Sequence, residues 1–481
     1  MGILSNLEPK NVFHFFEEIC NIPHGSGNVE QISNYLVDFA KERGLYYEQD
    51  EMKNVIIVKE ATQGYEDQPP VIIQGHMDMV AVKKPDCNID MKTEGLRLAI
   101  DGDKIYAEGT SLGGDDGIAV AYGLALLDSE ALKHPRLEVV ITVDEETGMD
   151  GARGIDLSML KGNRLLNLDS EEEGIFLTSC AGGAGVLCEM AFEPDLQDGC
   201  LYEVVIGGLQ GGHSGVEIHK ERGNANLLMA RLLWDLADVE AGVVKCQGGM
   251  ADNAIPRETT AILVIPDGKK EPFEERLHRF EKEVAAELAT KDPGFRVSVK
   301  AKASGRVVCV AGIELKKAVA LLLGLPGGVQ SMSADVPGLV ETSLNLGVLQ
   351  INTEKMQAMY AVRSCIESCK EALLKKIEAI TYLAGGKFIC TGSYPGWAYR
   401  VDSPLRDKMI ALYEEIYGAK PQVEAIHAGL ECGLLASKIE DLDCVSFGPN
   451  MYNIHTTEEY LSISSVERVW EYLVRLLEKK D

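Results

Sequence analysis

The chain has 481 residues, too many for one hydrophobic core of ordinary size, so we expect at least two domains. Lys and Arg total 47 against 75 Asp and Glu, and the net charge of −28 disfavours nucleic acid and anionic lipid as partners. No apolar run approaches the roughly 20 residues that span a bilayer, and no secretory signal opens the chain, so we expect a cytoplasmic protein without a membrane partner.

The first 186 residues are expected to form the first segment of an α/β domain. Amphipathic patterns predict helices at 12–20 and 28–44. Strands are predicted at 54–60, 69–78, 137–148 and 163–174, and residues 94–109 predict a β-hairpin. Residues 113–132 indicate a glycine-rich loop that enters a helix. Buried strands that alternate with helices favour an α/β fold, a mixed sheet flanked by helices.

The pattern changes near residue 185. Longer strands of alternating character follow, separated by amphipathic helices, and they predict an inserted α+β domain over 187–395. The α/β pattern returns over 396–481, which we expect to be the second segment of the first domain. No internal repeat is visible in the sequence.

Histidine and acidic side chains interrupt the buried runs of the first segment at four places. They are His76 with Asp78, Asp115 with Asp116, Glu145 with Glu146, and Asp169. Each place lies at or just after the carboxyl end of a predicted strand, the edge of an open α/β sheet where ligand sites form. Because unpaired acids are rarely buried, four such interruptions at one edge predict a cation site.

Local geometry agrees with this reading. Side chains two positions apart on a strand share a face, so Asp78 can accept the second ring N–H of His76 and leave the other nitrogen for a metal. Consecutive Glu145 and Glu146 point to different sides, so one can ligate a metal while the other reaches a water. Taken alone, an HxD pair is more often a structural histidine, and only the joint occurrence favours metal. His455, in another loop after a strand, is the candidate ligand for a second metal.

The motifs GHMDMV, GGDDG, VDEETG, NLDSEE and NIHTTEE resemble those of the dinuclear zinc aminopeptidase and carboxypeptidase superfamily, within its aminoacyl-histidine dipeptidase family. The resemblance covers nearly the whole chain, including GGHSG and NAIPRE in the inserted domain and HAGLECG near the end. It implies a cis peptide bond between Asp115 and Asp116. Related enzymes carry GxDN or GxDDK at this loop, so Asp116 adds a possible negative charge beside the metals.

The resemblance also implies two Zn²⁺ ions per chain, with Mn²⁺ or Co²⁺ as possible substitutes. Asp115 would bridge the two ions. His76 and Asp169 would complete one metal site. Glu146 and His455 would complete the other.

Further roles are implied for residues that do not bind metal. Glu145 would be the general base, and Asp78 would orient His76. In the inserted domain, which would act as a lid, His213 would donate to the carbonyl oxygen of the substrate, from its own subunit or from a partner. Asn253 and Arg363 would bind the C-terminal carboxylate of the substrate, for which the two-pronged guanidinium is well suited.

The expected function is hydrolysis of unblocked dipeptides, preferentially Xaa-His such as β-alanyl-histidine, by a water that two metals activate. An N-acyl amino acid deacylase of the same superfamily would share every metal ligand. A catalytically inactive metal-dependent binding protein would keep the ligands but would have no need of Glu145. The large insertion and HAGLECG favour the dipeptidase. The expected partner is a small peptide substrate, and a homodimer is possible.

Overall fold

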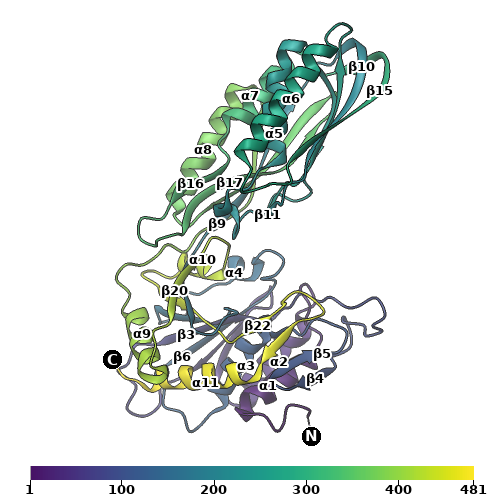
Figure 1. Ribbon diagram of the computed structural model, residues 1–481. Helices are drawn as coiled ribbons and strands as arrows, with labels where there is room; N and C mark the ends of the chain where they lie inside the picture. The colour runs from purple at the N-terminus through teal and green to yellow at the C-terminus, as the bar shows by residue number, and fades with distance from the viewer. Residues whose placement is uncertain (1) are drawn as a thin grey trace. The chain divides into compact units, whose positions relative to one another are not determined.

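The computed structural model describes residues 2–481, which divide into two compact units (Figure 1). Unit 1 takes in the described part of Met1–Ser179, with Tyr399–Ala425 and Leu430–Asp481. Unit 2 takes in Cys180–Ala398 and Ile426–Gly429. We expected the inserted domain at 187–395. In the structure unit 2 extends from Cys180 to Ala398 and also contains the short segment 426–429.

The centre of unit 1 is an eight-stranded sheet in which parallel strands lie between antiparallel ones. In sheet order its strands are β1 (Tyr46–Gln49), β2 (Val55–Lys59), β6 (Leu137–Thr142), β3 (Val71–His76), β7 (Arg164–Asn167), β21 (Asp443–Ser446), β8 (Ile175–Cys180) and β20 (Gln422–Ile426). Strands β6, β3, β7 and β21 run parallel to one another. Their residues are buried or nearly so, as expected of strands covered on both faces.

Helices cover both faces of this sheet. They are α1 (Lys10–Cys20), α2 (Glu30–Glu42), α3 (Gly114–Asp128), α4 (Asp150–Gly154), α9 (Pro404–Tyr417), α10 (Glu431–Ala436) and α11 (Ile463–Glu478). The longer ones share a core with Ile57, Ile73 and Val139 of the sheet, and the short helices α4 and α10 lie on the other face (Figure 1). A small second sheet contains β4 (Leu98–Asp101), β5 (Lys104–Ala107), β22 (Met451–Tyr452) and β23 (Tyr460–Ser462).

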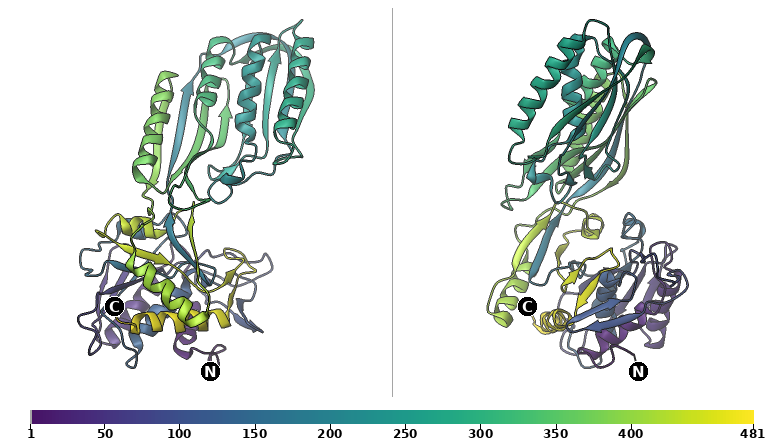
Figure 2. Two further views of the ribbon diagram at one scale, coloured as in Figure 1. Left: turned by 60° about the vertical axis from the view of Figure 1, so that its left-hand side comes forward. Right: turned by 45° about the vertical axis from the view of Figure 1, so that its right-hand side comes forward.

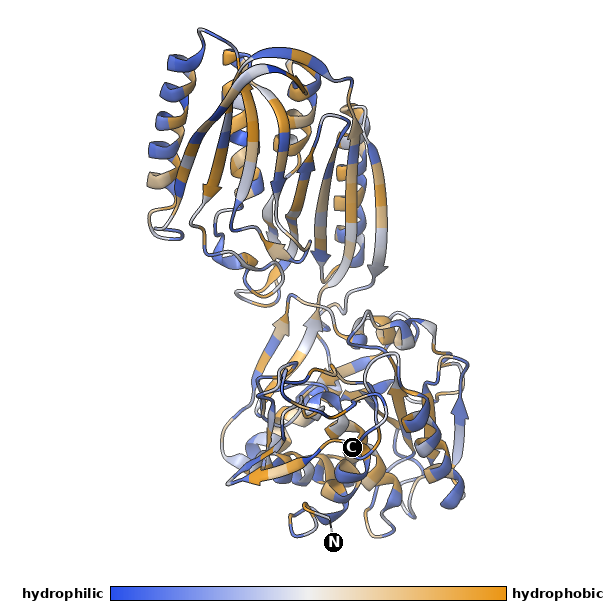
Figure 3. Cartoon of the chain, turned by 90° about the vertical axis from the view of Figure 1, so that its right-hand side faces the viewer, coloured by the Kyte–Doolittle hydropathy of each residue, from blue (hydrophilic) through white to orange (hydrophobic). Residues whose placement is uncertain are grey.

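Unit 2 is a nine-stranded sheet with four long helices on one face (Figure 2). The strands are β9 (Gly182–Ala191), β10 (Asp195–Gly207), β12 (Gly242–Gly248), β14 (Thr259–Ile265), β15 (Arg296–Cys309), β16 (Gly328–Met332), β17 (Val340–Ile351), β18 (Lys355–Ser364) and β19 (Lys387–Tyr394). The helices are α5 (Ala225–Asp235), α6 (Lys270–Glu287), α7 (Gly312–Gly324) and α8 (Glu367–Leu383), with 3₁₀ turns at Ile218–Lys220 and Leu236–Val239. A separate pair joins β11 (Gly212–His213) to β13 (Ala254–Ile255). Hydrophobic and hydrophilic residues alternate along the strands (Figure 3), and the apolar side chains meet the helices in one core.

Unit 2 consists of two halves with the same order of elements. The first half follows the chain as β10, α5, β12, β14, α6 and β15, and from the outer edge its sheet order is β15-β10-β14-β12. The second half consists of β9, α7, β17, β18, α8 and β19, in the equivalent order β19-β9-β18-β17. The halves join where β12 pairs antiparallel with β17. Because no repeat is visible in the sequence, the two halves share the order of their elements but no visible pattern of residues.

The predicted fold class, a mixed α/β sheet flanked by helices with an inserted α+β domain, is confirmed. The hairpin predicted at 94–109 is present as β4 and β5, with Gly102 at a positive φ of 60° in the turn. Within residues 2–481, no helix combines the length and the apolar character needed to cross a bilayer.

Candidate metal centre and active site

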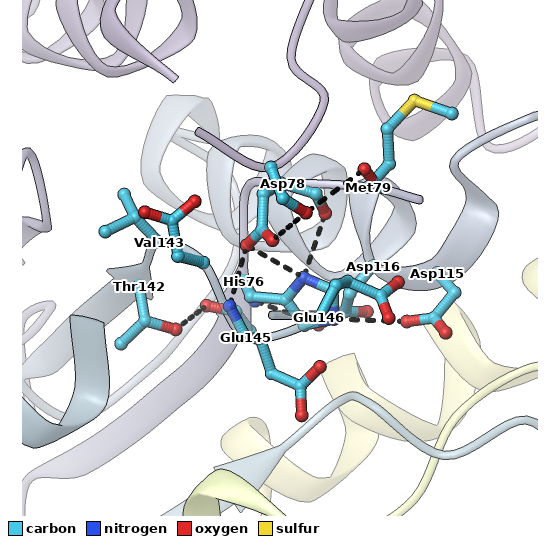
Figure 4. A network of polar contacts seen from close by, with 12 residues as sticks. His76, Asp78, Met79, Asp115, Asp116, Thr142, Val143, Glu145 and Glu146 are labelled. Atoms are coloured by element: carbon cyan, nitrogen blue, oxygen red, sulfur yellow. Dashed lines mark hydrogen bonds and ion pairs between the residues drawn. The ribbon is translucent and has the colours of Figure 1, made fainter. Parts of the chain in front are cut away.

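The residues that interrupt the predicted strands meet at one edge of the sheet of unit 1 (Figure 4). His76 is the last residue of β3, and Glu145 and Glu146 follow the end of β6. Asp169 follows β7. Asp115 and Asp116 stand in the first turn of α3, where their backbone departs from helical geometry and the peptide bond between them is cis.

Asp115 lies between two histidine rings. Its Oδ1 is 3.1 Å from His76 Nε2, and its Oδ2 is 3.2 Å from His455 Nε2. Each oxygen of this carboxylate therefore faces a different ligand-type nitrogen. Two cations placed between these atoms would share Asp115, which is the arrangement of a bridging ligand.

A further acid stands beside each histidine. Asp169 Oδ1 is 3.5 Å from His76 Nε2, and Glu146 Oε2 is 3.0 Å from His455 Nε2. Glu146 Oε1 is buried without a hydrogen-bond partner, so it is available to a cation. Ligand atoms within 4.8 Å of one another form two groups: His76 with Asp116 and Asp169, and His76 with Asp115 and Glu146. Asp116, which the sequence did not predict as a ligand, thus lies at ligand distance too.

The histidines and acids of this cluster share hydrogen-bonded protons, and these contacts and burial shift their pKa values. Hydrogen bonds to Asp115 and Glu146 raise the pKa of His455 to about 10. Burial opposes ionisation of Asp115, but hydrogen bonds from His455 and His76 lower its pKa. Burial raises the pKa of Asp169. A divalent cation would displace such protons, and a set of imidazole and carboxylate ligands suits Zn²⁺, Mn²⁺ and Co²⁺.

Asp78 orients two parts of the site. His76 Nδ1 is 2.9 Å from the backbone carbonyl of Asp78 and 3.5 Å from its carboxylate, so the ring N–H donates to the carbonyl and Nε2 is left for a metal. The carboxylate accepts from the Glu145 N–H at 3.1 Å and from the Ser26 hydroxyl at 2.8 Å. The Asp78 carboxylate therefore lies beside His76, as expected, and it also holds the loop of Glu145.

Asp116 stabilises the end of β3 through a hydrogen bond to its backbone. Its Oδ2 accepts from the His76 N–H at 3.1 Å. A Cβ at Gly75 would come within 2.5 Å of both Asp116 Oδ2 and Ala119 Cβ, so β3 and α3 can approach this closely only at a glycine. Gly75 of GHMDMV and Asp116 of GGDDG therefore both serve the close packing of β3 against α3.

Glu459 is a residue of the site that the sequence did not single out. Its Oε2 accepts from the N–H groups of Leu112 and Gly113 at 2.8 and 3.2 Å, and its Oε1 accepts from that of Gly114 at 2.8 Å. These residues directly precede Asp115. One acidic side chain four positions after His455 thus fixes the loop of the candidate bridging ligand, a link for which NIHTTEE is the only sequence signal.

Glu145 is partly buried, and its side chain points away from the histidine and aspartate pairs (Figure 4). Burial raises the pKa of its carboxyl, and the charges of Glu431, Asp115 and Glu146 raise it further. A carboxylate with a raised pKa beside a cation site has the properties of a proton acceptor.

In unit 2, the ring of His213 is fixed by its own loop. Nδ1 accepts from the N–H groups of Gly215 and Val216 at 3.2 and 3.3 Å, so the ring proton lies on Nε2. Burial and the charge of Arg363 lower the pKa of His213. The result is a neutral ring whose Nε2–H is a hydrogen-bond donor.

The loop of Asn253 is held close to His213 within the same unit. Residues His213 and Ala254 pair between β11 and β13, and the Ser214 N–H donates to the Asn253 carbonyl at 2.8 Å. Asn345 of β17 anchors this loop from the other half by donating to the carbonyls of Asp252 and Ala254 at 2.8 and 2.9 Å. The loop therefore lies at the seam between β12 and β17.

Arg363 stands on β18 opposite Ser343 of β17. Its Nη1 is 3.5 Å from the Tyr394 hydroxyl, its Nε is buried without a partner, and no ion pair to it occurs within residues 2–481. His427, which the sequence did not single out within HAGLECG, lies 2.7 Å from the Ser343 hydroxyl through Nε2. Burial and the nearby Arg363 lower the pKa of His427 to about 3. Unit 2 thus holds a guanidinium without an acid beside two neutral imidazoles, a setting that favours an anion.

Comparison with known proteins places this arrangement among peptidases. Residues 72–479 match the profile of peptidase family M20/M25/M40. The chain is 36% identical over 482 aligned residues to the cytosol non-specific dipeptidase of Escherichia coli K12, covering 100% of this chain and 99% of that protein.

Solved structures agree with the sequence match. The aminoacylhistidine dipeptidase of Vibrio alginolyticus superposes with a TM-score of 0.94 at 36% identity, over 99% of this chain and 98% of that one. Aminopeptidase PepT of Bacillus cereus has a TM-score of 0.57 at 16% identity, over 98% of each chain, which shows a shared fold.

Proposed function

This chain belongs to peptidase family M20/M25/M40, and from that premise we propose that it is a metal-dependent dipeptidase that hydrolyses unblocked dipeptides. One observation carries the proposal. The two oxygens of Asp115 face His76 and His455, with a further carboxylate beside each ring. Such a set has no use in a protein that lacks cations.

We propose two Zn²⁺ ions, for which Mn²⁺ or Co²⁺ are possible substitutes. His76, Asp169 and Asp115 would hold one ion, and Asp115, Glu146 and His455 the other. The buried, unpartnered Oε1 of Glu146 supports this assignment. When bound, the ions would polarise the scissile carbonyl and lower the pKa of a water.

Glu145 is proposed as the general base. Its backbone N–H is fixed by Asp78, so its carboxylate is presented from a loop of defined geometry. It would take a proton from the attacking water and then deliver the proton to the leaving amine. Each step needs a carboxyl group whose pKa is near neutrality, and the raised pKa of Glu145 fits that need.

His213 is proposed to donate to the carbonyl oxygen of the substrate. The two backbone N–H groups that Nδ1 accepts commit the ring proton to Nε2. A neutral donor aimed at an oxygen that gains negative charge stabilises the transition state more than the ground state.

Arg363 and Asn253 are proposed to bind the C-terminal carboxylate. Among residues 2–481 the guanidinium has no acidic partner, so a substrate carboxylate would supply one. Such a clamp fixes the chain end one residue beyond the scissile bond and so limits substrates to short peptides.

The two relatives reported at 36% identity differ in the substrate range that their names give, non-specific for one and aminoacyl-histidine for the other. We propose Xaa-His dipeptides such as β-alanyl-histidine as preferred substrates, with the cytoplasm as the site of action. A deacylase would share the metal ligands but would accept a neutral acyl group where we place a free amine.

The test compares chelator-treated protein with protein reloaded with Zn²⁺, Mn²⁺ or Co²⁺. The substrates are β-alanyl-histidine, other free dipeptides and N-acetylated amino acids. We expect metal-dependent release of free amino acids from unblocked dipeptides, fastest from those that end in His. If kcat/KM is highest for N-acetylated amino acids, the deacylase takes the place of the dipeptidase.

A further inference from the structure

A fully buried acid stands behind the ligand-bearing strands of unit 1 without a part in the chemistry proposed so far. Glu431 is the first residue of α10 and its exposed fraction is 0%. Its Oε2 accepts from Gln74 Nε2 and from Thr142 Oγ1, each at 2.6 Å. Its Oε1 is buried and has no hydrogen-bond partner.

The partners of Glu431 belong to the strands that carry the candidate metal ligands. Gln74 lies two positions before His76 on β3, so the two side chains share a face. Thr142 is the last residue of β6 and pairs with His76 across the sheet. Asn167, two positions before Asp169, donates to Gln74 Oε1 at 2.6 Å. These side chains therefore form a polar network within the sheet, next to the residues that would bind metal.

The carboxylate of Glu431 contacts only neutral groups in the described part of the chain. Both of its donors are neutral, and no ion pair to it occurs within the described range 2–481. Glu138 gives the contrast, since it is equally buried on β6 but has Arg136 Nε at 2.8 Å and the Gly162 N–H at 2.9 Å. Burial raises the pKa of Glu431 to about 7, and a cation nearby would favour the charged form of this carboxyl.

The nearest place for such a cation is the candidate metal centre. Glu431 lies within electrostatic range of His76, Asp169 and Asp78. Electrostatic interactions act strongly through a dry interior, so an ion at His76 and Asp169 would be attracted by Glu431 without touching it.

We propose that Glu431 is a positioning residue whose buried carboxylate is an outer counter-charge for the metal pair. It fixes the ends of β3 and β6 through Gln74 and Thr142, and its negative charge increases the affinity of the centre for divalent cations. The inference rests on the metal sites proposed above. The arrangement stabilises the metal-loaded protein at the expense of the metal-free one.

The test is Glu431→Gln, which retains one oxygen for Gln74 and Thr142 but removes the charge. Competition with a chelator measures affinity for Zn²⁺ at about pH 8, above the value of about 7 to which burial raises the pKa of Glu431. We expect the variant to bind Zn²⁺ about 10- to 100-fold more weakly than the unchanged protein, the usual effect of an outer partner. Thermal unfolding of the metal-free protein should shift the other way, with Tm higher by about 2 °C or more, because an uncompensated charge is gone.

Weaker Zn²⁺ binding together with a higher Tm of the metal-free protein distinguishes this role from a merely structural one. Glu138→Gln is the matched control, since it removes an equally buried charge that has a partner, and it should lower the metal-free Tm while metal affinity stays unchanged. The proposal is overturned if Glu431→Gln fails to fold, lowers the metal-free Tm, or binds Zn²⁺ as tightly as the unchanged protein. If the unchanged protein itself binds no divalent cation, the proposed function fails instead.

Discussion

Replacement of Arg363 by Met tests how the substrate is recognised. Met retains most of the apolar stem but removes the charge and all five donors. Within residues 2–481 the guanidinium makes no ion pair, and its one side-chain contact, to the Tyr394 hydroxyl, is long at 3.5 Å. We therefore expect Arg363→Met to fold and to unfold at a similar temperature.

The magnitude follows from the missing partner. A partly buried guanidinium that becomes enclosed with a carboxylate when substrate binds contributes about 2–5 kcal/mol to that complex. At about 1.4 kcal/mol per factor of ten, kcat/KM for a free dipeptide should fall roughly 30- to 4,000-fold. A dipeptide with a C-terminal amide has no such charge, so its slower hydrolysis should change little.

The assay measures kcat/KM of the unchanged protein and of Arg363→Met, each with a dipeptide and with its C-terminal amide. The unchanged protein should favour the acid by the factor above, and Arg363→Met should lose that preference. Arg306→Met, a change at an exposed arginine of the same unit, is the control and should behave as the unchanged protein. If Arg363→Met keeps the full preference for the acid, another group reads the carboxylate and the clamp is refuted.

Four further predictions concern the metal centre and its donors. Glu145→Gln should retain metal and fold but lose at least about 10²-fold in kcat, since an amide cannot accept the proton; near-normal turnover would assign the base elsewhere. Elemental analysis of reconstituted protein should approach two ions per chain, and a plateau at one would exclude the bridge at Asp115. His213→Phe should lower kcat by about 10²- to 10³-fold with metal content unchanged, through loss of the Nε2–H donor; an unchanged kcat would remove His213 from the reaction. Because Asp115 and Glu146 raise the pKa of His455 to about 10, metal binding near pH 7 should release a proton, so affinity should increase with pH. Calorimetry in two buffers of different ionisation heat measures that proton, and equal heats would contradict its release.

The positions of His76, Glu146 and Asp169 were predictable because these residues end or follow strands, whereas Asp115 lies in the first turn of α3. Buried runs such as 71–76 and 137–142 are visible in the sequence, and the carboxyl ends of parallel strands meet at one edge. The supporting contacts were not predictable. Glu459 reaches the loop before Asp115 across more than 300 positions, and Glu431 reaches Gln74 in the same way, and neither contact leaves a periodic signal.

For unit 2 the sequence predicted the elements but not how they are ordered in the sheet. Its strands and helices were visible as amphipathic patterns, but the equivalence of its halves lies in the order of the strands and not in the residues. The cluster around Arg363 depends on which strands meet at the seam, a non-local choice. His427 was missed for a related reason, since Ile426–Gly429 is a short return of the late chain to unit 2.

The order of the segments in the chain has a consequence for synthesis. The first half of unit 2, from β10 to β15, is continuous, whereas the second half encloses it and unit 1 encloses both. Strand β21 lies between β7 and β8 in the sheet of unit 1, although hundreds of residues are translated after those neighbours before β21 emerges. His455 is made later still. On the ribosome the innermost half can therefore fold first, and the nascent chain has an incomplete set of candidate ligands until His455 is made.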